Sequence, residues 1–384
     1  MSEWKSLGEV CDFSKDKVAI SVLDLGNYIS TENLLPNKGG VTEAASLPKI
    51  VTTTSFNVGD ILISNIRPYF KKIWRAKFSG GCSNDVLVIR AKKNVEPRFL
   101  YYVLSEDKFF DLVTATAKGT KMPRGDKQVI MNYPVPDFPL ETQKKIAAVL
   151  SALDDKIELN NAINKNLEEQ AQTIYKNMFV DNFNPAWKSG TLSDIVDVRD
   201  GTHDSPKKVD DKFFLITSKH LLPFGVEISS ANTISEKDFN KINERSAVNK
   251  HDILLSMIGT VGIISFVIES DINFAIKNVG LIKTSEKPQY KYYLLSYLKS
   301  NFMRQYIERV LAGTTQKYIS LAELRKIPVN FSDSQTLNEY NVRVEPIFLK
   351  IAANIQENQK LGEIRDLLLP RLMSGEIDVS AMKI

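Results

Sequence analysis

The chain has few of the residues that stabilise proteins through disulfides or metal ions. Its 384 residues include two cysteines, Cys11 and Cys82, and three histidines, His203, His220 and His251. Two cysteines do not make a disulfide framework, and the three histidines have no counterparts in the first half of the chain. We therefore expect no bound metal, and the low cysteine content favours a reducing compartment.

Long hydrophobic runs are also missing. The longest uncharged stretch, Ile253–Ile268, contains Ser256, Gly259 and Gly262, which fits two buried strands and a turn better than a membrane span. The first residues do not have the pattern of a secretory signal peptide. These features predict a cytoplasmic protein with no membrane partner.

Short catalytic motifs are absent as well. The sequence has no GxxxxGK[ST], GxGxxG, HExxH, GxSxG or CxxC motif. The Asn/Asp-Pro-Pro-aromatic tetrapeptide of amino-methyltransferases is missing, since Asn184-Pro185 is followed by Ala186. The absences favour a binding protein over an enzyme, so no catalytic residue is predicted.

What the chain does contain is a repeat of itself. Five segments of the first half return in the second half: Trp4–Ser6 as Trp187–Ser189, Gly59–Ser64 as His251–Ser256, Pro97–Ser105 as Pro288–Ser296, Gly119-Thr120 as Gly313-Thr314, and Pro134-Val135 as Pro328-Val329. A duplicated fold gives a nearly twofold molecule, which suits a nearly twofold partner such as double-helical DNA.

Each half follows the same predicted plan of strands, a short amphipathic helix, a glycine-threonine loop and a long helix. The expected strands are Asp60–Asn65, Asp85–Arg90, Asp252–Met257 and Gly262–Val267, and the expected short helices span 98–113 and 289–311. The predicted fold class is α+β. Two similar recognition domains, 1–139 and 185–333, are separated by two long helices, 140–184 and 334–384 with its C-terminal tail.

The long helices show a coiled-coil seam. Apolar residues recur at alternating steps of three and four, and asparagines occupy matching places in both seams: Asn160 and Asn164, then Asn354 and Asn358. An asparagine at a seam can face solvent, but the repeated pair favours a device that fixes the register. We expect the helices to pair antiparallel and to meet at Asn164 and Asn358. Such a pair would hold two recognition domains at a fixed separation.

Charge adds a weaker signal. The net charge is +4, and residues 1–140 and 187–333 are mildly basic whereas the intervening and final stretches are mildly acidic. Ordinary fluctuation explains a difference of this size equally well. The local clusters carry more information about partners than the total does.

Two basic clusters of the first half are candidate DNA contacts. The first is interleaved with aromatic residues, and strand alternation would place cations on one face with aromatics beneath them. The second lies in a loop with glycine and proline that can reach phosphates and present arginine to a guanine edge. A solvated charged face is the alternative for both. The candidates are Arg67, Lys71, Lys72 and Arg75, followed by Lys118, Thr120, Lys121, Arg124 and Lys127.

The matching places of the second half are small and polar rather than basic. Glycines there permit close backbone approach, and threonine or glutamine suits base edges and phosphates. The turn-forming segment Arg199–Pro206 is a further candidate, although it could equally be an inert loop. The candidate DNA-binding residues of this half are Arg199, Thr202, His203, Thr260, Thr314, Thr315, Gln316 and Lys317.

With these residues in view, the chain resembles the specificity subunit of a type I restriction-modification system. The resemblance covers nearly the whole length. Its local marks are Asp200-Gly201-Thr202-His203, Ser64–Tyr69, Gly119–Arg124 and the terminal Leu367–Ile377. One departure is Arg365, which stands where the second seam expects an apolar residue.

The resemblance implies a DNA-recognition subunit without catalytic residues. In that family each target recognition domain reads one half of an asymmetric, interrupted sequence in double-stranded DNA. The long helices form an antiparallel spacer that binds two modification subunits. Those partners use S-adenosylmethionine to methylate adenine, and restriction subunits added to the complex cleave DNA with ATP and Mg²⁺. No cofactor is expected on this chain itself.

Two other classes of function remain open from the residues alone. One is a methyltransferase or nuclease with unfamiliar motifs, which would modify or cut DNA without other subunits. The other is an architectural DNA-binding scaffold with equal affinity for all duplexes. Sequence preference, and its dependence on partner subunits, separates the three.

Overall fold

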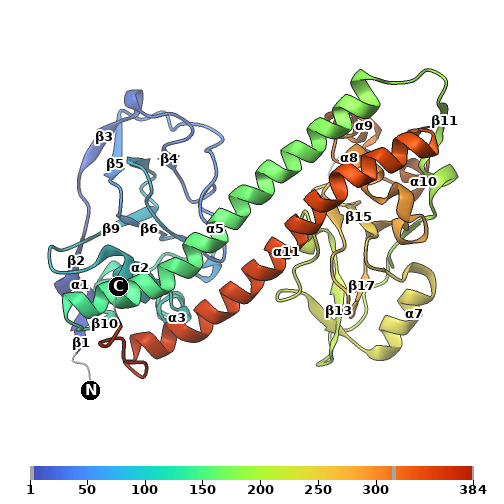
Figure 1. The fold of residues 1–384 in the computed structure, drawn as a ribbon. Coiled ribbons are helices and arrows are strands. Elements are labelled where there is room, and N and C mark those ends of the chain that lie inside the picture. Colours follow the sequence, from blue (N-terminus) through green and yellow to red (C-terminus); the bar gives the residue numbers. More distant parts are fainter. Residues whose placement is uncertain (1–3, 314–316, 383–384) are drawn as a thin grey trace. The chain divides into compact units, whose positions relative to one another are not determined.

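The computed structural model describes residues 4–313 and 317–382. The chain divides into two compact units, which we call unit 1 (Met1–Glu158 with Asn358–Ile384) and unit 2 (Leu159–Glu357). Each unit combines a domain of strands and short helices with a segment from each of two long helices (Figure 1). The α+β class with two similar domains and two long helices is therefore confirmed.

The domain of unit 1 begins and ends with a strand, and these two strands pair with each other. Its strands are β1 (Trp4–Ser6), β2 (Cys11–Phe13), β3 (Lys17–Ala19), β4 (Tyr28–Ile29), β5 (Thr52–Phe56), β6 (Ile61–Ser64), β7 (Ile73–Arg75), β8 (Gly80–Cys82), β9 (Val86–Ala91) and β10 (Pro134–Pro136). Its helices are α1 (Leu7–Val10), α2 (Pro97–Ser105), α3 (Asp107–Ala115) and α4 (Lys127–Met131), with 3₁₀ turns η1 (Ile20–Val22) and η2 (Pro68–Phe70).

Unit 2 repeats much of this order with additions of its own. Its strands are β11 (Lys188–Thr191), β12 (Val198–Asp200), β13 (Phe213–Ile216), β14 (Asn232–Ile234), β15 (Ile253–Ser256), β16 (Ile264–Phe266), β17 (Phe274–Ile276), β18 (Val279–Ile282) and β19 (Pro328–Phe331). Its short helices are α6 (Leu192–Ile195), α7 (Glu236–Ser246), α8 (Lys291–Leu298), α9 (Asn301–Val310) and α10 (Leu321–Arg325), with 3₁₀ turns at Ser218–His220, Thr284–Glu286 and Pro288–Tyr290.

The two units share one sheet topology. Unit 1 has a four-stranded sheet of order β2-β9-β6-β7, and unit 2 has the corresponding order β12-β18-β15-β16. The equivalent pairs β1-β10 and β11-β19 close each domain. The register also agrees, because Ser64 lies opposite Val86 and Ser256 lies opposite Val279. Asp85 and Asn278 therefore occupy equivalent positions. Each directly precedes the strand of its sheet that comes last in the sequence, β9 in unit 1 and β18 in unit 2.

The second sheets differ between the units. Unit 1 forms β3-β5-β8-β4, whereas unit 2 forms the three-stranded β14-β13-β17. Helix α7, which begins with Ser235 as its N-cap, belongs to unit 2 and packs on β17. The shared sheet is thus the constant part of each domain, and the second sheet is the part that has changed.

The predicted short helices are each two helices in the structure. The predicted helix over 98–113 breaks at Glu106, whose extended backbone separates α2 from α3. The helix predicted over 289–311 breaks at Ser300, whose side chain accepts a hydrogen bond from the amide of Met303 and caps α9. The apolar spacing continues across both breaks, so periodicity alone did not reveal them.

The long helices are α5 (Leu140–Lys176), which continues into a π-helical turn at Asn177–Asp181, and α11 (Ser334–Met373). Within unit 2 they run antiparallel. Asn354 donates to Asn164 at 2.8 Å, and Asn160 donates to the carboxylate of Glu357 at 2.8 Å. The partner of Asn164 is Asn354, so the expectation that Asn164 meets Asn358 was wrong by one helical turn.

Unit 1 contains its own antiparallel segment of the same two helices. Arg365, the apparent defect of the second seam, forms an ion pair with Asp154 of α5 at 2.8 Å. The same carboxylate accepts a hydrogen bond from the hydroxyl of Tyr102 at 2.7 Å. The charged side chain is therefore paired on the opposing helix, and the seam does not break there.

The apolar faces of the long helices belong to the domain cores. In unit 1, Ile146 and Leu150 of α5 and Leu372 of α11 pack with Phe99 and Val103 of α2. The core of unit 2 is built likewise from Tyr175, Tyr340, Val344 and Ile351 of the long helices with Tyr293 of α8. Each domain therefore needs both helices to bury its own apolar surface.

An ion pair with a buried carboxylate lies at the same position of both sheets. In unit 1, Arg90 binds Asp60 with two hydrogen bonds, at 2.9 and 2.8 Å. In unit 2, Lys283 binds Asp252 at 2.7 Å, and the two side chains are 3% and 0% exposed. The carboxylate also accepts backbone amide hydrogen bonds from Asn249 and Ser285, so its charge is fully compensated.

We predict that Asn354→Leu lowers the free energy of unfolding by roughly 1–3 kcal/mol, because it leaves the buried Asn164 amide without its partner. The double variant Asn164→Leu with Asn354→Leu should be as stable as the wild type or more stable, since it removes both polar groups. Urea denaturation followed by circular dichroism measures this. Asn166→Leu on the exposed face of α5 is the control, and a double variant less stable than the single would contradict the prediction.

We predict that Lys283→Met destabilises the chain by about 3–5 kcal/mol, because Asp252 would remain buried and unpaired. Arg90→Met should cost less, since the Arg90 side chain is 35% exposed and water can reach the remaining Asp60 more readily. Thermal and chemical unfolding of both variants test the order. An equal loss of unfolding free energy in the two variants would contradict the prediction, because it would show that burial of the ion pair does not determine the loss.

Candidate nucleic-acid interface

Two loops of unit 1 are joined at one end of the shared sheet. The first loop follows β6 and the second contains Gly119-Thr120. The amide of Arg67 donates to the carbonyl of Pro123 at 2.8 Å, and Gly125 donates to Asn65 at 3.1 Å. Ile66 and Arg124 form an isolated β-bridge. We call these joined segments, 65–72 and 118–125, the loop pair of unit 1.

Unit 2 builds an equivalent loop pair from segments 257–263 and 312–318. Ile258 bridges Tyr318, as Ile66 bridges Arg124 in unit 1. Ile319 donates to the carbonyl of Met257 at 3.0 Å. Three of the predicted contact residues, Thr314, Thr315 and Gln316, lie outside the described residues.

The loop after the central strand carries a backbone constraint at two positions. In unit 2 these positions are glycines with positive φ, Gly259 at 82° and Gly262 at 91°. In unit 1 they are Arg67 at 50° and Lys71 at 51°. A left-handed conformation costs a residue with a Cβ roughly 1–3 kcal/mol, and such strain concentrates at functional sites. Unit 1 thus keeps two cationic side chains where glycine would be more stable.

Several cationic side chains of the unit 1 loop pair form ion pairs with acidic side chains. Lys71 pairs with Asp107 of α3 at 3.0 Å, and Lys118 pairs with Asp126 at 2.7 Å. Arg124 pairs with Asp85 at 3.0 Å while about half of its side chain stays exposed. Asp85 therefore fixes an arginine that faces solvent, which is a suitable arrangement for directed hydrogen bonding.

The remaining candidates of unit 1 are placed differently from one another. Arg67 and Lys121 form no side-chain hydrogen bond or ion pair with other described residues. Lys72 donates to the carbonyl of Thr31, and burial lowers its pKa. Arg75 lies opposite Ile61 in the register of β6 and β7, at the end of the sheet that is far from the loop pair. Thr120 is exposed in the second loop, and Lys127 lies 5.9 Å from the ring of Phe13.

The aromatic residues of the first cluster do not form a continuous layer beneath the cations, although Lys72 Nζ lies 5.9 Å from the ring centroid of Phe70. Tyr69 and Phe70 lie on η2, exposed, with ring centroids 4.7 Å apart. Trp74 alone is buried, packed edge-on against Phe56. The expected strand alternation fails here because 68–70 form a 3₁₀ turn and β7 begins only at Ile73.

The segment after β12 in unit 2 is held by a polar network around Asp200. The Asp200 carboxylate is 5% exposed, and it binds the Nη2 atom of Arg245 and the Nε2 atom of His203, the latter at 3.0 Å. His203 also contacts the side-chain oxygen of Asn278 through Nδ1 at 2.8 Å. A Cβ at Gly201 would collide with the carbonyl oxygen of Ile276, so glycine is required at that position.

Other candidates of unit 2 surround this network or the loop pair. Arg199 pairs with Asp197 at 2.6 Å and donates to the carbonyl of Arg245 at 2.9 Å. The Thr202 hydroxyl accepts a hydrogen bond from the amide of Asp204. Thr260 and Lys317 are exposed on the two loops. Arg245 and Asn278 were missed from the sequence, because α7 and the β17–β18 turn reach the site from elsewhere in the chain.

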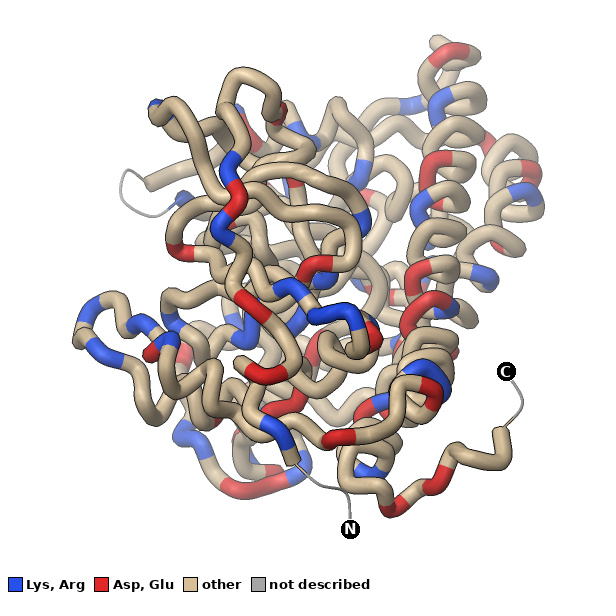
Figure 2. The backbone as a smooth tube through the Cα atoms, turned by 90° about the vertical axis from the view of Figure 1, so that its left-hand side faces the viewer, with Lys and Arg blue, Asp and Glu red and all other residues tan. Residues whose placement is uncertain are grey.

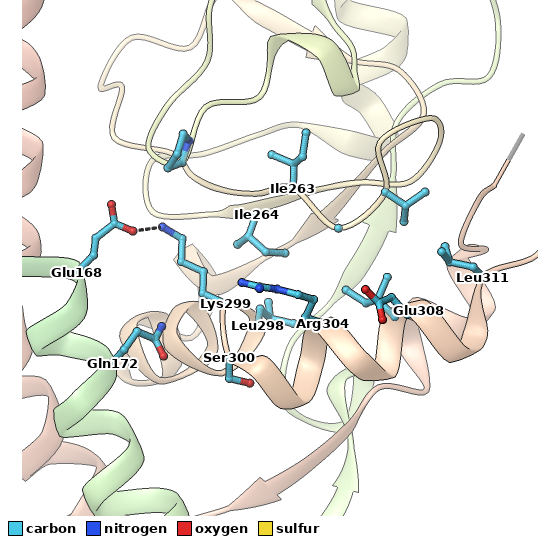
Figure 3. A pocket seen from close by; sticks show the side chains of 14 residues that line it. Glu168, Gln172, Ile263, Ile264, Leu298, Lys299, Ser300, Arg304, Glu308 and Leu311 are labelled. Atoms are coloured by element: carbon cyan, nitrogen blue, oxygen red, sulfur yellow. Dashed lines mark hydrogen bonds and ion pairs between the residues drawn. The ribbon is translucent and has the colours of Figure 1, made fainter. Parts of the chain in front are cut away.

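A hollow of about 440 Å³ lies between α5, α9 and β16 in unit 2 (Figure 3). Lys299 pairs there with Glu168 at 3.0 Å, and its ammonium group lies 4.1 Å from the ring centroid of Phe224. Burial lowers the pKa of Lys299. This lysine therefore links the domain to α5.

Several absences concern the described part of the chain. Over residues 4–313 and 317–382, no three His, Cys, Asp or Glu side chains are grouped as a metal site. Burial raises the pKa of the Cys11 and Cys82 thiols to about 12, which makes both poor nucleophiles. Among these residues, no helix has the length and apolar character needed to cross a membrane. In Figure 2, the positions of Lys and Arg and those of Asp and Glu are both spread along the backbone, with short stretches of a single sign.

The family model described as type I restriction modification DNA specificity domain matches residues 1–169 and 184–340. The chain belongs to this family. The model matches it twice, once for each of the similar domains. Sequence-specific target recognition for a type I restriction-modification system is thus the function that the family assignment gives the chain.

Similar proteins of this family align along nearly the whole chain. The specificity subunit of the type I restriction enzyme MjaIX from Methanocaldococcus jannaschii is 27% identical, over 94% of this chain and 87% of its own length. That of HindI from Haemophilus influenzae is 24% identical, over 98% and 100%. The crystal structure of the type I S subunit from M. genitalium has the same fold, with a TM-score of 0.56, 15% identity, and coverage of 99% and 97%.

We predict that a comparison of Arg67→Gly with Arg67→Ala distinguishes the effect of backbone strain on stability from the effect of the lost charge on DNA binding. Both variants lose the cation, so both should weaken DNA binding. Glycine relieves the left-handed strain and alanine does not, so the glycine variant should be more stable than the alanine variant by about 1 kcal/mol. Denaturation curves and DNA titrations of both variants test this. Full DNA affinity in either variant would remove Arg67 from the interface.

Proposed function

We propose that the chain reads an asymmetric, two-part sequence in double-stranded DNA, with one half-site recognised by each unit. The observation that carries this proposal is the loop pair. Both units form it with the same backbone connections, yet the side chains differ: Arg67, Lys71 and Arg124 in unit 1 correspond to Gly259, Gly262 and Tyr318 in unit 2. A common frame with different side chains suits the recognition of two different half-sites.

Contacts in unit 1 divide into two chemical roles. Lys71, Lys72 and Lys121 would bind phosphates, because an ammonium group provides charge without a fixed direction. Arg67 and Arg124 would contact base edges, since guanidinium can donate two parallel hydrogen bonds to guanine. The ion pair of Arg124 with Asp85 supports this role by fixing the direction of the guanidinium group.

The chain would act without catalysing a reaction itself. In this proposal two modification subunits bind along the long helices and methylate adenine with S-adenosylmethionine, and restriction subunits add cleavage that uses ATP and Mg²⁺. Exposed apolar side chains on α11 support a partner surface there, namely Val342 and Leu349 within unit 2 and Ile364 and Leu367 within unit 1. The helices would also set the number of base pairs between the half-sites.

The two alternatives predict different behaviour. A non-specific scaffold would bind all duplexes equally, and a self-sufficient enzyme would methylate or cut DNA alone. Co-expression with modification subunits, followed by genome-wide mapping of methylated adenine, distinguishes them. The proposal requires one interrupted motif that appears only when this chain and the modification subunits are both present.

We predict that Arg124→Gln relaxes the motif at one half-site and leaves the other unchanged. Discrimination at the affected base pair should fall by about 1–3 kcal/mol. Lys121→Gln should instead weaken binding to all duplexes and reduce the slope of log affinity against log salt by about one. Methylation mapping and salt-dependent DNA titration measure the two effects. An unchanged motif in the Arg124 variant would exclude that residue from base recognition.

A further inference from the structure

Arg245 of α7 reaches the same sheet end as the loop pair of unit 2. Asp200, to which it is bonded, lies opposite Gly280 in the sheet, and the neighbouring Val279 lies opposite Ser256, where the first loop begins. Helix α10 starts just after Tyr318 of the second loop and packs on β12. Arg245 therefore lies at the same end of the sheet as the loop pair, with β18 between β12 and β15, although α7 lies far from both loops in sequence.

The position of Arg245 is fixed from several sides. Its Nη2 atom binds both the carboxylate and the backbone carbonyl of Asp200. Nε2 of His203 lies 3.0 Å from the second carboxylate oxygen, and its Nδ1 lies 2.8 Å from Oδ1 of Asn278, so the carboxylate has a neighbour on each oxygen. Arg199 donates to the carbonyl of Arg245 and secures the end of α7. A buried anion thus orients a guanidinium group whose side chain is 63% exposed.

The surface around Arg245 has room for a partner. A hollow of about 250 Å³ lies between α7 and residues 202–206, and a larger one of about 710 Å³ lies between α7, β12 and α10. Arg245 lines both hollows. Within the described residues, its Nε and Nη1 atoms form no hydrogen bond. These donors are available to a ligand on the exposed side.

In unit 1 a carboxylate also orients an exposed arginine, but that arginine lies in a loop rather than on a helix. There Asp85, the residue before the last strand of the sheet, holds the exposed Arg124. In unit 2 the equivalent residue is Asn278, which holds His203, and His203 in turn holds the carboxylate that fixes Arg245. Tyr318 stands at the place of Arg124. Arg245 thus supplies in unit 2 the fixed guanidinium that Arg124 supplies in unit 1.

We propose that Arg245 contacts a base edge of the DNA half-site read by unit 2, and that Asp200 and His203 are its positioning residues. This inference rests on the proposed function. The charge of Arg245 is compensated by Asp200, so its attraction for a phosphate is reduced. Its directed N–H donors remain, and they match the acceptors of guanine in the major groove. His203 then acts through Asp200, since both of its ring nitrogens are already engaged.

The test compares Arg245→Gln with Lys237→Gln in the full chain bound to its modification subunits. Lys237 is an exposed cation on the same helix and lines neither hollow. Arg245→Gln should reduce the ratio of affinities for the cognate duplex and a duplex altered in the second half-site by about 5- to 150-fold. The Lys237 variant should keep the wild-type ratio, and the half-site read by unit 1 should be unaffected in both.

Asp200→Asn provides a readout that a purely structural role would not change. It removes the anion and leaves Arg245 as an uncompensated cation. Cognate discrimination should fall as in Arg245→Gln, while affinity for unrelated duplexes and the steepness of its salt dependence should rise. Melting temperatures of the variants check that the chain remains folded. Arg245→Gln, which alters an exposed side chain, tests the proposal even if Asp200→Asn does not fold.

Two results would overturn the inference. Unchanged discrimination in Arg245→Gln excludes a base contact, and equal weakening for every duplex with a shallower salt dependence assigns Arg245 to a phosphate instead. Either result leaves the proposed function intact if the wild type is sequence-specific and Arg124→Gln alters the other half-site. If the wild-type complex does not distinguish duplexes, the proposed function itself fails.

Discussion

The burial of the long helices in the domain cores is the constraint on which the rest of the structure depends. Ile146 and Leu150 are core residues of unit 1, just as Tyr175 and Val344 are core residues of unit 2. Neither domain can therefore lose its helix segments without exposing apolar surface. The constant sheet packs on this base, and the loop pair rises from one end of that sheet. The side chains of each loop pair are thus supported by a sheet whose order is the same in both units.

Polar groups inside this frame give it a defined alignment. The hydrogen bond between Asn164 and Asn354 is satisfied at a single helix register, and the ion pair of Arg365 with Asp154 sets a second point in unit 1. Each group would be buried without a partner after a slip of the helices. Hydrophobic packing supplies most of the stability, whereas these polar contacts select one arrangement among several that packing alone would tolerate.

The sequence predicted features that arise from local pattern. The repeat, the strands around Ile61 and Ile253 and the two long helices follow from apolar periodicity, and the structure contains all of them. Register across helices was predicted less well, because seam spacing does not say which asparagine faces which. Arg245 could not be found at all, since its relation to Asp200 is created by the fold. The domain boundaries and the DNA contacts remain predictions.

The glycines of the unit 2 loop differ from their counterparts in unit 1 in the side chains that the loop could carry. A Cβ added at Gly259 would meet no atom within 4 Å, and one at Gly262 would meet only Ile307 at 3.6 Å. A single-codon change can therefore introduce a new side chain at Gly259 without disturbing the packing, at a cost of roughly 1–3 kcal/mol in backbone strain. The corresponding loop of unit 1 already has two such residues, Arg67 and Lys71. Gly259 is thus a position at which the loop of unit 2 can accept a side chain while the sheet beneath it keeps its packing.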